Sequence, residues 1–471
     1  MSESGRYVRL VALFGVGLVA LFAAFNLVVD PYGNFDVPRI AGVNARALGF
    51  NRQPLLAKSL AISRVQPASV ILGNSRPESA YDPAHSGFAA RPAYNLAVGG
   101  AGLGQIRRYF LEALGTGRLR QVLLATDFSM FDPSLQSAHR VPEMFMLTDE
   151  SGRNAGAGRK WERLAFTLLS GAATGDSWWS LRRQRDPVVQ YSSSGLREVT
   201  EDERKVEREG GHRSASLLTE STFLATNLRD TTLPRFHDGY EALLGEFREL
   251  AEMSAQRGIR LDVVINPIHA RLSYVYAAAG LWPVYEQWKR DLVAAVAHAG
   301  GSVALWDFSG VSACTSEPMP AEGDAKTKMR WYRESGHFRP NLGTLVLDRV
   351  FGLGAGAACP DLGRRLDDAT LDATLAGQRT ALRRWIATHP GDAAEIDALA
   401  RRYGRTPPAG TPGPFLPSTM MQSPNSTSSD VMPGSGNPRR RTLERMMRAT
   451  TLSTRRVAHR RLRTSALVET R

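Results

Sequence analysis

The chain has 471 residues, of which 43% are hydrophobic, 22% are charged and only two are cysteines. A chain of this length and composition can bury one or two apolar cores, which excludes a wholly disordered protein, a collagen-like fibre and a disulfide-stabilised miniprotein. The formal net charge is +13, but eleven Arg and two Glu between Arg439 and Arg471 supply +9 of it. The rest of the chain is nearly balanced, so the net charge gives little support to nucleic-acid binding.

The first feature along the chain is an uncharged, almost wholly apolar segment at residues 10–29. Twenty helical residues rise about 30 Å, which matches the thickness of a bilayer core. Arg6 and Arg9 precede the segment, and basic residues favour the cytoplasmic side of a membrane. We therefore expect a single-pass anchor in the inner membrane, with the bulk of the chain in the periplasm. A cleaved signal peptide is the alternative, because Ala23 and Ala24 are small.

Short apolar strands then alternate with amphipathic helices. The predicted strands are Ser69–Leu72, Ala93–Leu96, Gln121–Ala125, Arg260–Asn266 and Val303–Trp306, and the clearest helices are Gln105–Leu114, Tyr240–Gln256 and Trp282–His298. This alternation predicts an α/β fold in which helices cover both faces of a parallel sheet.

The composition divides the chain into segments with different expectations. These are a cytoplasmic end (1–9), the anchor (10–29), a linker packed on the domain (30–66), an α/β domain (67–360) with an insertion of helix and loop (133–235), a helical extension (361–404) and a disordered basic tail (405–471).

Polar residues gather where the predicted strands end, which is where open parallel sheets place their sites. Ser75 follows the first strand, and Glu334 precedes His337 by three residues in a late loop. A serine hydroxyl needs a neutral imidazole to take its proton, and the imidazole needs a carboxylate to orient it. The pattern therefore favours nucleophilic acyl chemistry. Ser75 as a simple helix N-cap is the plainer alternative.

The chain resembles the SGNH/GDSL hydrolase superfamily over roughly residues 67–352. The resemblance is carried by Ser75 in ILGNSRPES after the first strand, Gly100 in VGGAGLG after the second, and His337 in the late HFRPNLG. It implies a flavodoxin-like three-layer α/β/α sandwich with a five-stranded parallel sheet. It also implies Ser75 as nucleophile, His337 as general base and Gly100 as an oxyanion donor. The anchor and DPYGNF are similar to membrane-anchored envelope members related to O-acyltransferases and D-alanylation accessory proteins.

Two positions depart from the pattern of this superfamily. The orienting acid is Glu334 instead of an aspartate, which is one methylene longer. Asp127 stands after the third strand, where the superfamily has an asparagine that donates to the oxyanion. A carboxylate would repel a developing oxyanion, and loss of one donor typically lowers the rate by about 10²–10³. Weak activity or a repurposed site is therefore an open alternative.

Other polar residues at the strand ends are candidate substrate-binding residues. Arg76 either binds an anionic substrate or pairs with Glu78. Asp127 and Asn266 come at the ends of the third and fourth strands. His269 either contacts substrate or is a hydrogen-bonded structural residue. The glycines near Gly100 do not form G-x-G-x-x-G, and no Walker, H-E-x-x-H or EF-hand motif is present. We expect no cofactor and no metal.

The two cysteines, Cys314 and Cys359, fit an oxidising compartment and form either a disulfide or two buried thiols. Two functions remain open. The first is a membrane-anchored serine esterase or O-acyltransferase that acts on an envelope polysaccharide, with a membrane acyl-donor protein as partner in the acyltransferase case. The second is a non-catalytic envelope-binding or assembly protein on the same fold.

Overall fold

The computed structural model describes residues 3–405 apart from residue 36 and the segments 134–144, 228–232 and 355–357. The basic tail predicted at 405–471 lies outside the described residues, except for Arg405. Within the described part, one helix is long and apolar enough to cross a membrane. This is α1 (Glu3–Val29), in which an 18-residue stretch within Ser4–Val29 has a mean hydropathy of 2.4.

The centre of the fold is a six-stranded sheet in the order β2-β1-β3-β4-β5-β8. Its strands are β1 (Ser69–Leu72), β2 (Ala93–Asn95), β3 (Gln121–Thr126), β4 (Arg260–Ile265), β5 (Val303–Asp307) and β8 (Arg364–Leu366). The first five pair in parallel and lie in the segments where the sequence predicts strands. The prediction of a five-stranded sheet is wrong by one strand, because β8 pairs antiparallel with β5 and adds a sixth strand at that edge.

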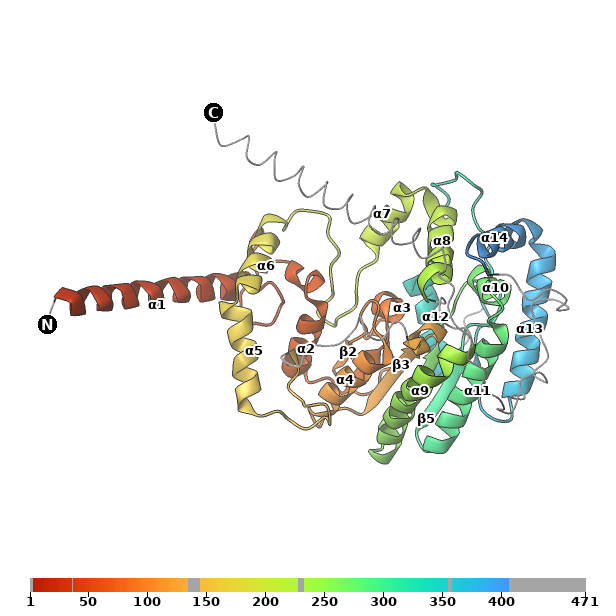
Figure 1. Ribbon diagram of the computed structural model, residues 1–471, viewed down its shortest axis with the longest axis horizontal. Coiled ribbons are helices and arrows are strands. Elements are labelled where there is room, and N and C mark those ends of the chain that lie inside the picture. The colour runs from red at the N-terminus through yellow and green to blue at the C-terminus, as the bar shows by residue number, and fades with distance from the viewer. Residues whose placement is uncertain (1–2, 36, 134–144, 228–232, 355–357, 406–471) are drawn as a thin grey trace, which may run out of the picture. The chain divides into compact units, whose positions relative to one another are not determined.

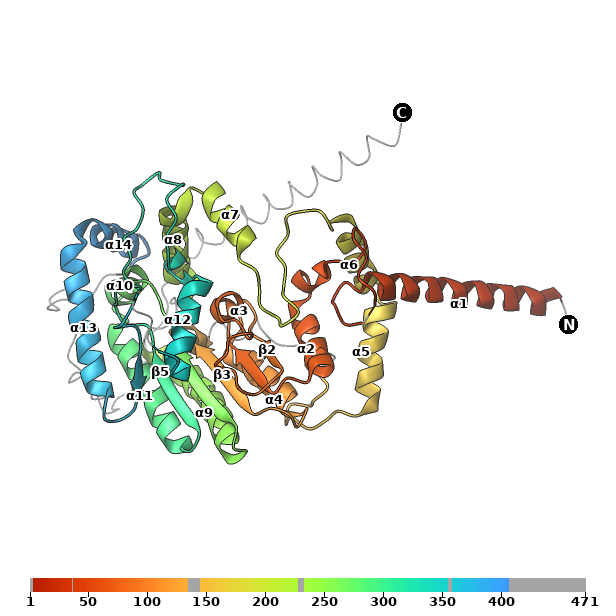
Figure 2. The same ribbon diagram turned by 180° about the vertical axis from the view of Figure 1, so that it is seen from behind.

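Helices cover both faces of this sheet (Figures 1 and 2). Consecutive residues of a strand point to opposite faces. Accordingly, Val70 and Leu72 of β1 pack in one apolar cluster with residues of α4 (Leu103–Leu114), α9 (Leu233–Gln256) and α11 (Trp282–Ala299). Ile71 packs in the other cluster, with residues of α12 (Pro340–Phe351). Both faces of the strands are buried, as their near-continuous apolar sequences require.

The segment 133–235 is a mixture of helix and loop. It contributes α5 (Ala157–Leu169), α6 (Gly171–Arg182), α7 (Thr200–Arg208), α8 (Gly211–Thr222) and the π-helical turn η5 (Phe223–Asn227). Helices α5 and α6 pack against α1, whereas α7 and α8 pack against each other and α8 against β6 (Tyr332–Glu334). The insertion therefore packs against two separate parts of the molecule, namely α1 and the hairpin that begins with β6.

The segments on either side of the α/β domain are more structured than expected. The predicted linker contains the short helix η1 (Leu48–Asn51) and helix α2 (Pro54–Val65), in which every residue from Leu56 to Ile62 is buried. The predicted helical extension begins with β8 and continues with α13 (Leu371–Thr388) and α14 (Pro390–Arg402). Residues of α13 and α14 belong to the same apolar cluster as the sheet, so this extension is part of the domain.

Cys314 and Cys359 form a disulfide, as the more favoured of the two alternatives predicts. Their Cα atoms lie 5.9 Å apart, and the bridge closes a segment of 45 residues. Both cysteines are buried in the apolar cluster that contains Tyr332 and Phe338. The bridge therefore brackets the loop that carries Glu334 and His337.

Candidate active site

Ser75 lies at a sharp turn between β1 and α3 (Ser75–Ala80). Gly73 makes this turn with a φ of 149°, and a Cβ there would come within 2.5 Å of Pro77 and 2.8 Å of the carbonyl oxygen of Ala125. Only glycine fits so close an approach without a shift of its neighbours. The side chain of Asn74 then accepts a hydrogen bond from the N–H of Arg76 and caps α3. Ser75 is thus the first residue of the helix and not its cap.

Ser75, His337 and Glu334 form one chain of hydrogen bonds. The Oγ atom of Ser75 lies 2.7 Å from Nε2 of His337, and Nδ1 of His337 bonds to Oε1 of Glu334. Because a carboxylate can only accept, Nδ1 carries the proton and Nε2 is left to accept from the serine hydroxyl. Glu334 ends β6 and His337 begins β7 (His337–Phe338), so a tight antiparallel hairpin supplies both partners.

Glu334 is held as a carboxylate. Burial alone would raise its pKa, but the charge and hydrogen bond of His337 outweigh burial, and the pKa is lowered to about 2. The N–H of Gly336 donates to Oε2 of Glu334 over 2.7 Å, and the neighbouring side chain of Thr219 on α8 also lowers the pKa of the carboxyl group. The carboxylate therefore stays ionised at any pH at which His337 is neutral. The longer side chain of glutamate still reaches the imidazole.

Asp127 is the counterion of Arg76. A guanidinium nitrogen of Arg76 pairs with Oδ1 of Asp127, and both side chains are buried. The other carboxylate oxygen accepts from Nδ2 of Asn74 over 2.7 Å and from Nδ2 of Asn266 over 3.0 Å. Arg76 therefore does not pair with Glu78, as one of its two alternatives predicted. The negative charge that appeared to oppose an oxyanion is neutralised by a buried cation.

Arg76 also connects the turn at Ser75 to the hairpin. Its Nε donates to the carbonyl oxygen of Gly336, between Glu334 and His337. Burial disfavours the charged form of Arg76, yet the Asp127 carboxylate holds its pKa above the ordinary value. The predicted substrate-binding residues Arg76, Asp127 and Asn266 are therefore brought together in one buried network beside Ser75, where they hold the triad in place.

His269 takes the structural alternative. Its ring is buried, its Nδ1 accepts from the N–H of Arg271, and its Nε2 donates to the carbonyl oxygen of Glu317 over 2.9 Å. Burial lowers the pKa of His269 to about 4, so the ring is neutral near pH 7. The main-chain N–H of His269 donates to the carbonyl oxygen of Ser335, which lies in the hairpin that carries Glu334 and His337. His269 therefore helps to hold this hairpin in position.

A cavity of about 450 Å³ opens onto the triad. Ser75, Glu334 and His337 line it together with Val98 and Gly99. A Cβ on Gly99 would lie 3.9 Å from the Cβ of Ser75, so Gly99 is the glycine seen next to the nucleophile, one residue before the predicted Gly100. Within the described chain, no protein acceptor is found for the N–H of Ser75 or of Gly99. Both groups are free to donate to a ligand.

The opposite wall of the cavity comes from the insertion, which sequence reasoning did not assign to the site. Its lining residues there are Tyr191, Arg197, Asp202, Lys205, Val206, Glu209, Ala215, Leu218 and Thr219. Tyr191 donates to Glu78, whose other neighbour is the buried Lys58 at 3.7 Å, and burial lowers the pKa of Lys58 to about 8. Burial would raise the pKa of Asp202, but Arg197 and Arg333 outweigh it and lower that pKa.

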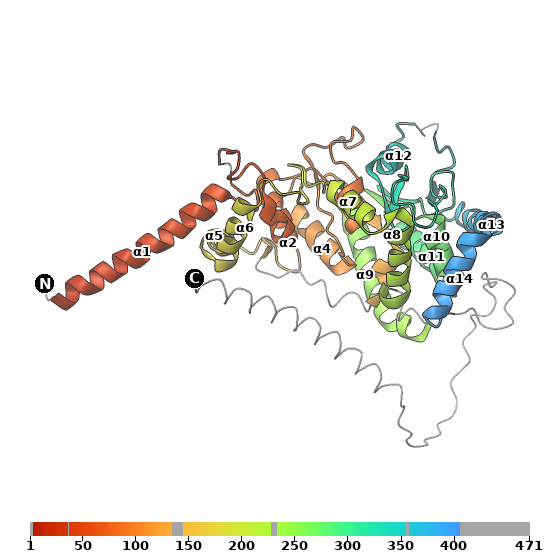
Figure 3. The ribbon, with the colours of Figure 1, turned by 90° about the horizontal axis from the view of Figure 1, so that it is seen from above.

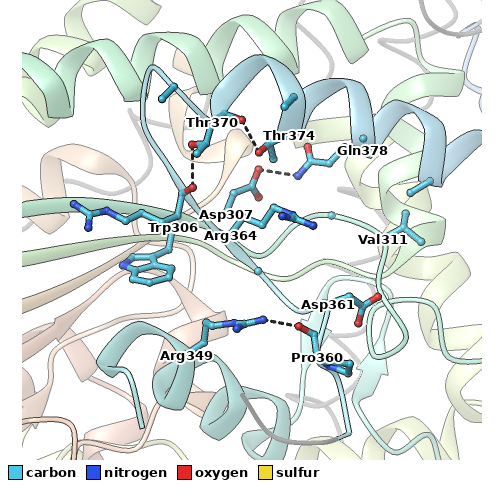
Figure 4. Close-up of a pocket in the computed structure, with 17 residues that line it drawn as sticks. Trp306, Asp307, Val311, Arg349, Pro360, Asp361, Arg364, Thr370, Thr374 and Gln378 are labelled. Carbon is cyan, nitrogen blue, oxygen red and sulfur yellow. Dashed lines mark hydrogen bonds between the residues drawn. The ribbon is translucent and has the colours of Figure 1, made fainter. Parts of the chain in front are cut away.

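A second cavity, of about 760 Å³, lies between β5, β8 and α13, away from the triad (Figure 4). Asp307 on its floor is fully satisfied, because it accepts from Nζ of Lys289 over 2.8 Å and from Nε2 of Gln378 over 2.9 Å. None of the triad residues lines this cavity. Among the described residues, no group of three or more His, Cys, Asp or Glu side chains is placed to hold a metal ion.

Comparison with known proteins adds no further constraint on this site. No family model matches the chain, and no curated protein matches it.

Proposed function

We propose that this chain is a membrane-anchored serine esterase or O-acyltransferase of the SGNH/GDSL type that acts on an envelope glycan or a similar hydroxyl-bearing substrate. The observation that carries the proposal is the hydrogen-bonded chain from Ser75 through His337 to an ionised Glu334, at the floor of a cavity. A structural N-cap serine has no need of an imidazole, and here Asn74 already caps the helix.

The reaction follows from the positions of the protons. His337 takes the proton of the Ser75 hydroxyl through Nε2 as the oxygen attacks the acyl carbonyl. The imidazolium, stabilised by Glu334, then gives that proton to the departing alkoxide, which leaves an acyl-serine. Water or a sugar hydroxyl, deprotonated in turn by His337, attacks this ester; the bond to Ser75 breaks, His337 returns the proton to the Ser75 oxygen, and the acid or the new ester is released. Esterase and acyltransferase differ only in that second acceptor.

The oxyanion would be held by main-chain donors. The N–H of Ser75 stands at the N-terminus of α3, where the first N–H groups of a helix have no partner within it. Gly99 or the predicted Gly100 supplies the second N–H. The pairing of Arg76 with Asp127 removes the argument against activity that the sequence raised, because the site carries no unpaired carboxylate next to Ser75.

The fold and the compartment support the same proposal. The parallel strands follow the order β2-β1-β3-β4-β5, which is the order of flavodoxin-like doubly wound folds and supports an SGNH-type α/β/α sandwich. The apolar α1 with Arg6 and Arg9 before its core, together with a disulfide, supports an inner-membrane anchor and a periplasmic domain.

The test is covalent labelling of the full-length protein in detergent with a fluorophosphonate probe, which reacts with activated serines. We expect stoichiometric labelling of wild type and none above background for Ser75→Ala. Ser86→Ala, at an exposed serine in the same region, is the matched control and should label like wild type. Equal labelling of wild type and Ser75→Ala would favour the non-catalytic binding protein instead.

A further inference from the structure

The apolar surface of α1 is exposed over most of its length, and α5 and α6 cover part of it near its end. Large apolar side chains are exposed along its length, for example Leu13 (67%) and Phe14 (74%), but Asn26 and Val29 are buried. The Nδ2 atom of Asn26 donates to the carbonyl oxygen of Leu168 at the end of α5, over 2.8 Å, and to Oγ1 of Thr174 on α6, over 3.0 Å. The amide nitrogen of this polar side chain in an apolar helix is thus bonded to both α5 and α6.

The chain that follows α1 is held just as firmly. Nδ2 of Asn44 donates to the carbonyl oxygen of Val28, Arg39 pairs with the buried Asp30 over 2.8 Å, and the hydroxyl of Tyr32 donates to Asp176 on α6 over 2.8 Å. These bonds tie the end of the helix to the domain without a loose linker. The domain therefore has a defined orientation with respect to α1.

The length of α1 sets the depth at which α5 and α6 meet it. If the bilayer core begins after Arg9, twenty residues at about 1.5 Å each bring its far boundary to Val29. Helix α6 contacts α1 at Phe25, whose ring lies 6.4 Å from that of Trp178, and this is four residues, or about 6 Å, before the boundary. Helices that lie in a membrane interface are buried by about 5–10 Å, which is the same depth.

The outer faces of α5 and α6 have the composition of such helices. Trp161 (68%), Leu169 (51%) and Trp178 (51%) are among the most exposed large apolar side chains outside α1. The guanidinium of Arg182 lies 4.8 Å from the ring of Trp178, which places a cation beside an aromatic side chain. Trp and Arg together are typical of the boundary between headgroups and acyl chains.

Each helix also buries one charged residue against the rest of the domain. Arg163 of α5 pairs with Glu112 of the α/β domain, and Asp176 of α6 pairs with Arg52 over 2.6 Å. In the views from the side and from above, α5 and α6 run across the end of α1, on the side of the domain from which α1 projects (Figures 1 and 3). A membrane crossed by α1 would therefore meet the exposed faces of these helices.

We infer that α5 and α6 lie in the outer interface of the bilayer that α1 crosses, with Trp161, Leu169 and Trp178 inserted among the lipids. The occupant of this surface is the lipid itself, since the surface continues the lipid-facing surface of α1 at the matching depth. The three helices then fix the height and tilt of the α/β domain above the membrane. This arrangement is independent of the reaction at Ser75.

The experiment uses the full-length protein in vesicles of phosphatidylcholine and phosphatidylglycerol, with bromine on the upper part of the acyl chains as a quencher of tryptophan fluorescence. Because α1 contains no Trp, quenching reports on the domain alone. We expect clear quenching of wild type and a quenched fraction about twofold smaller or less in Trp161→Phe/Trp178→Phe. Trp331→Phe/Trp385→Phe, at two buried positions, is the matched control. Its fluorescence should still be quenched, because Trp161 and Trp178 are both present.

Each outcome decides the inference. If the protein floats with the vesicles but the Trp161→Phe/Trp178→Phe variant is quenched as strongly as wild type, the helices do not lie in the interface. If Trp161 and Trp178 are instead quenched by aqueous iodide, their surface faces water and is free for a protein partner, which overturns the lipid assignment. A chain that does not float removes the anchor and the inference together. None of these readouts depends on labelling of Ser75.

Discussion

Arg76 connects three separate segments of the site, which are α3, the end of β3 and the hairpin that carries Glu334 and His337. Its guanidinium pairs with Asp127 after β3, and its Nε bonds to the carbonyl oxygen of Gly336 in the triad hairpin. The side chain thereby fixes the distance between Ser75 and His337, which come from positions 262 residues apart. A buried cation with a buried counterion is costly to break, because the remaining charge is left without a partner.

Arg76→Lys tests this positioning role. Lysine keeps the charge but cannot make both contacts at once, since an ammonium lacks the planar fork of a guanidinium. We expect fluorophosphonate labelling to slow by about 10–100-fold because small misplacements of catalytic groups are costly. Circular dichroism should still show a folded protein. An unchanged labelling rate would show that the network does not align the triad.

Glu334→Gln tests the orienting acid. The substitution keeps the shape of the side chain but removes the charge that stabilises the imidazolium, and it allows the wrong tautomer of His337. By analogy with amide substitutions in other triads, we expect the rate to fall by about 10²–10⁴. Because the pKa of Glu334 is about 2, the wild-type carboxylate should keep its charge in mild acid. Full activity of the variant would remove Glu334 from the triad.

His269 makes a prediction about pH and stability. Its pKa is about 4 in the folded protein, against an ordinary value of 6.5. The unfolded chain therefore takes up a proton first as the pH falls, so the free energy of unfolding should decrease between about pH 6.5 and pH 4, by roughly 3 kcal/mol. His269→Asn keeps a helix cap but cannot be protonated. Urea unfolding across this range should show a flatter pH dependence for the variant, and an equal slope would contradict the assignment.

At the scale of the elements, the sequence predicted the parts whose apolar pattern is local. The five parallel strands are short apolar runs that are buried on both faces, and they were located to within one residue at each end. The residue types and order of Ser75, Glu334 and His337, together with the resemblance to a known superfamily, predicted that these side chains meet, although Glu334 and His337 lie on the separate hairpin β6–β7 and not at a strand end of the parallel sheet.

The elements that were missed lack such a pattern. Strand β8 is three residues long and exposes Arg364 and Arg365, so nothing in its composition marks it as part of a sheet. Helix α2 buries Lys58 among its apolar residues, which obscures its periodicity. The role of α8 in the site depends on how a hundred-residue insertion folds back on the domain, and no local signal encodes that contact.

Helix α8 makes its own prediction through Thr219. Thr219→Val keeps the size of the side chain and removes the hydroxyl that helps to lower the pKa of Glu334. Because that carboxylate also accepts from His337 and Gly336, we expect a loss of only a few-fold in the labelling rate. Thr222→Val, at an exposed position on the same helix, should have no effect. A similar loss in both variants would indicate a general disturbance of α8 and not a contact with the triad.

At the scale of the whole molecule, the disulfide links the segment before the triad hairpin to the segment after α12. Cys314 precedes the triad hairpin and Cys359 follows α12, and both are packed with Tyr332 and Phe338, which flank Glu334 and His337. The bridge therefore restricts the segment that carries the hairpin. A bridge in the described domain also agrees with a chain that folds outside the cytoplasm.

Cys314→Ser/Cys359→Ser should consequently be less stable than wild type. Closing a loop of 45 residues stabilises a protein by about 4 kcal/mol in the chain-entropy model, which corresponds here to a fall in Tm of roughly 5–10 °C. Dithiothreitol should lower the Tm of wild type by a similar amount and leave that of the double variant unchanged, which separates loss of the bridge from other effects of the reductant. Mass spectrometry of a non-reduced digest should find the two cysteines in one linked peptide pair. Two alkylatable thiols in protein purified from membranes would contradict both the bridge and the extracytoplasmic location that it supports.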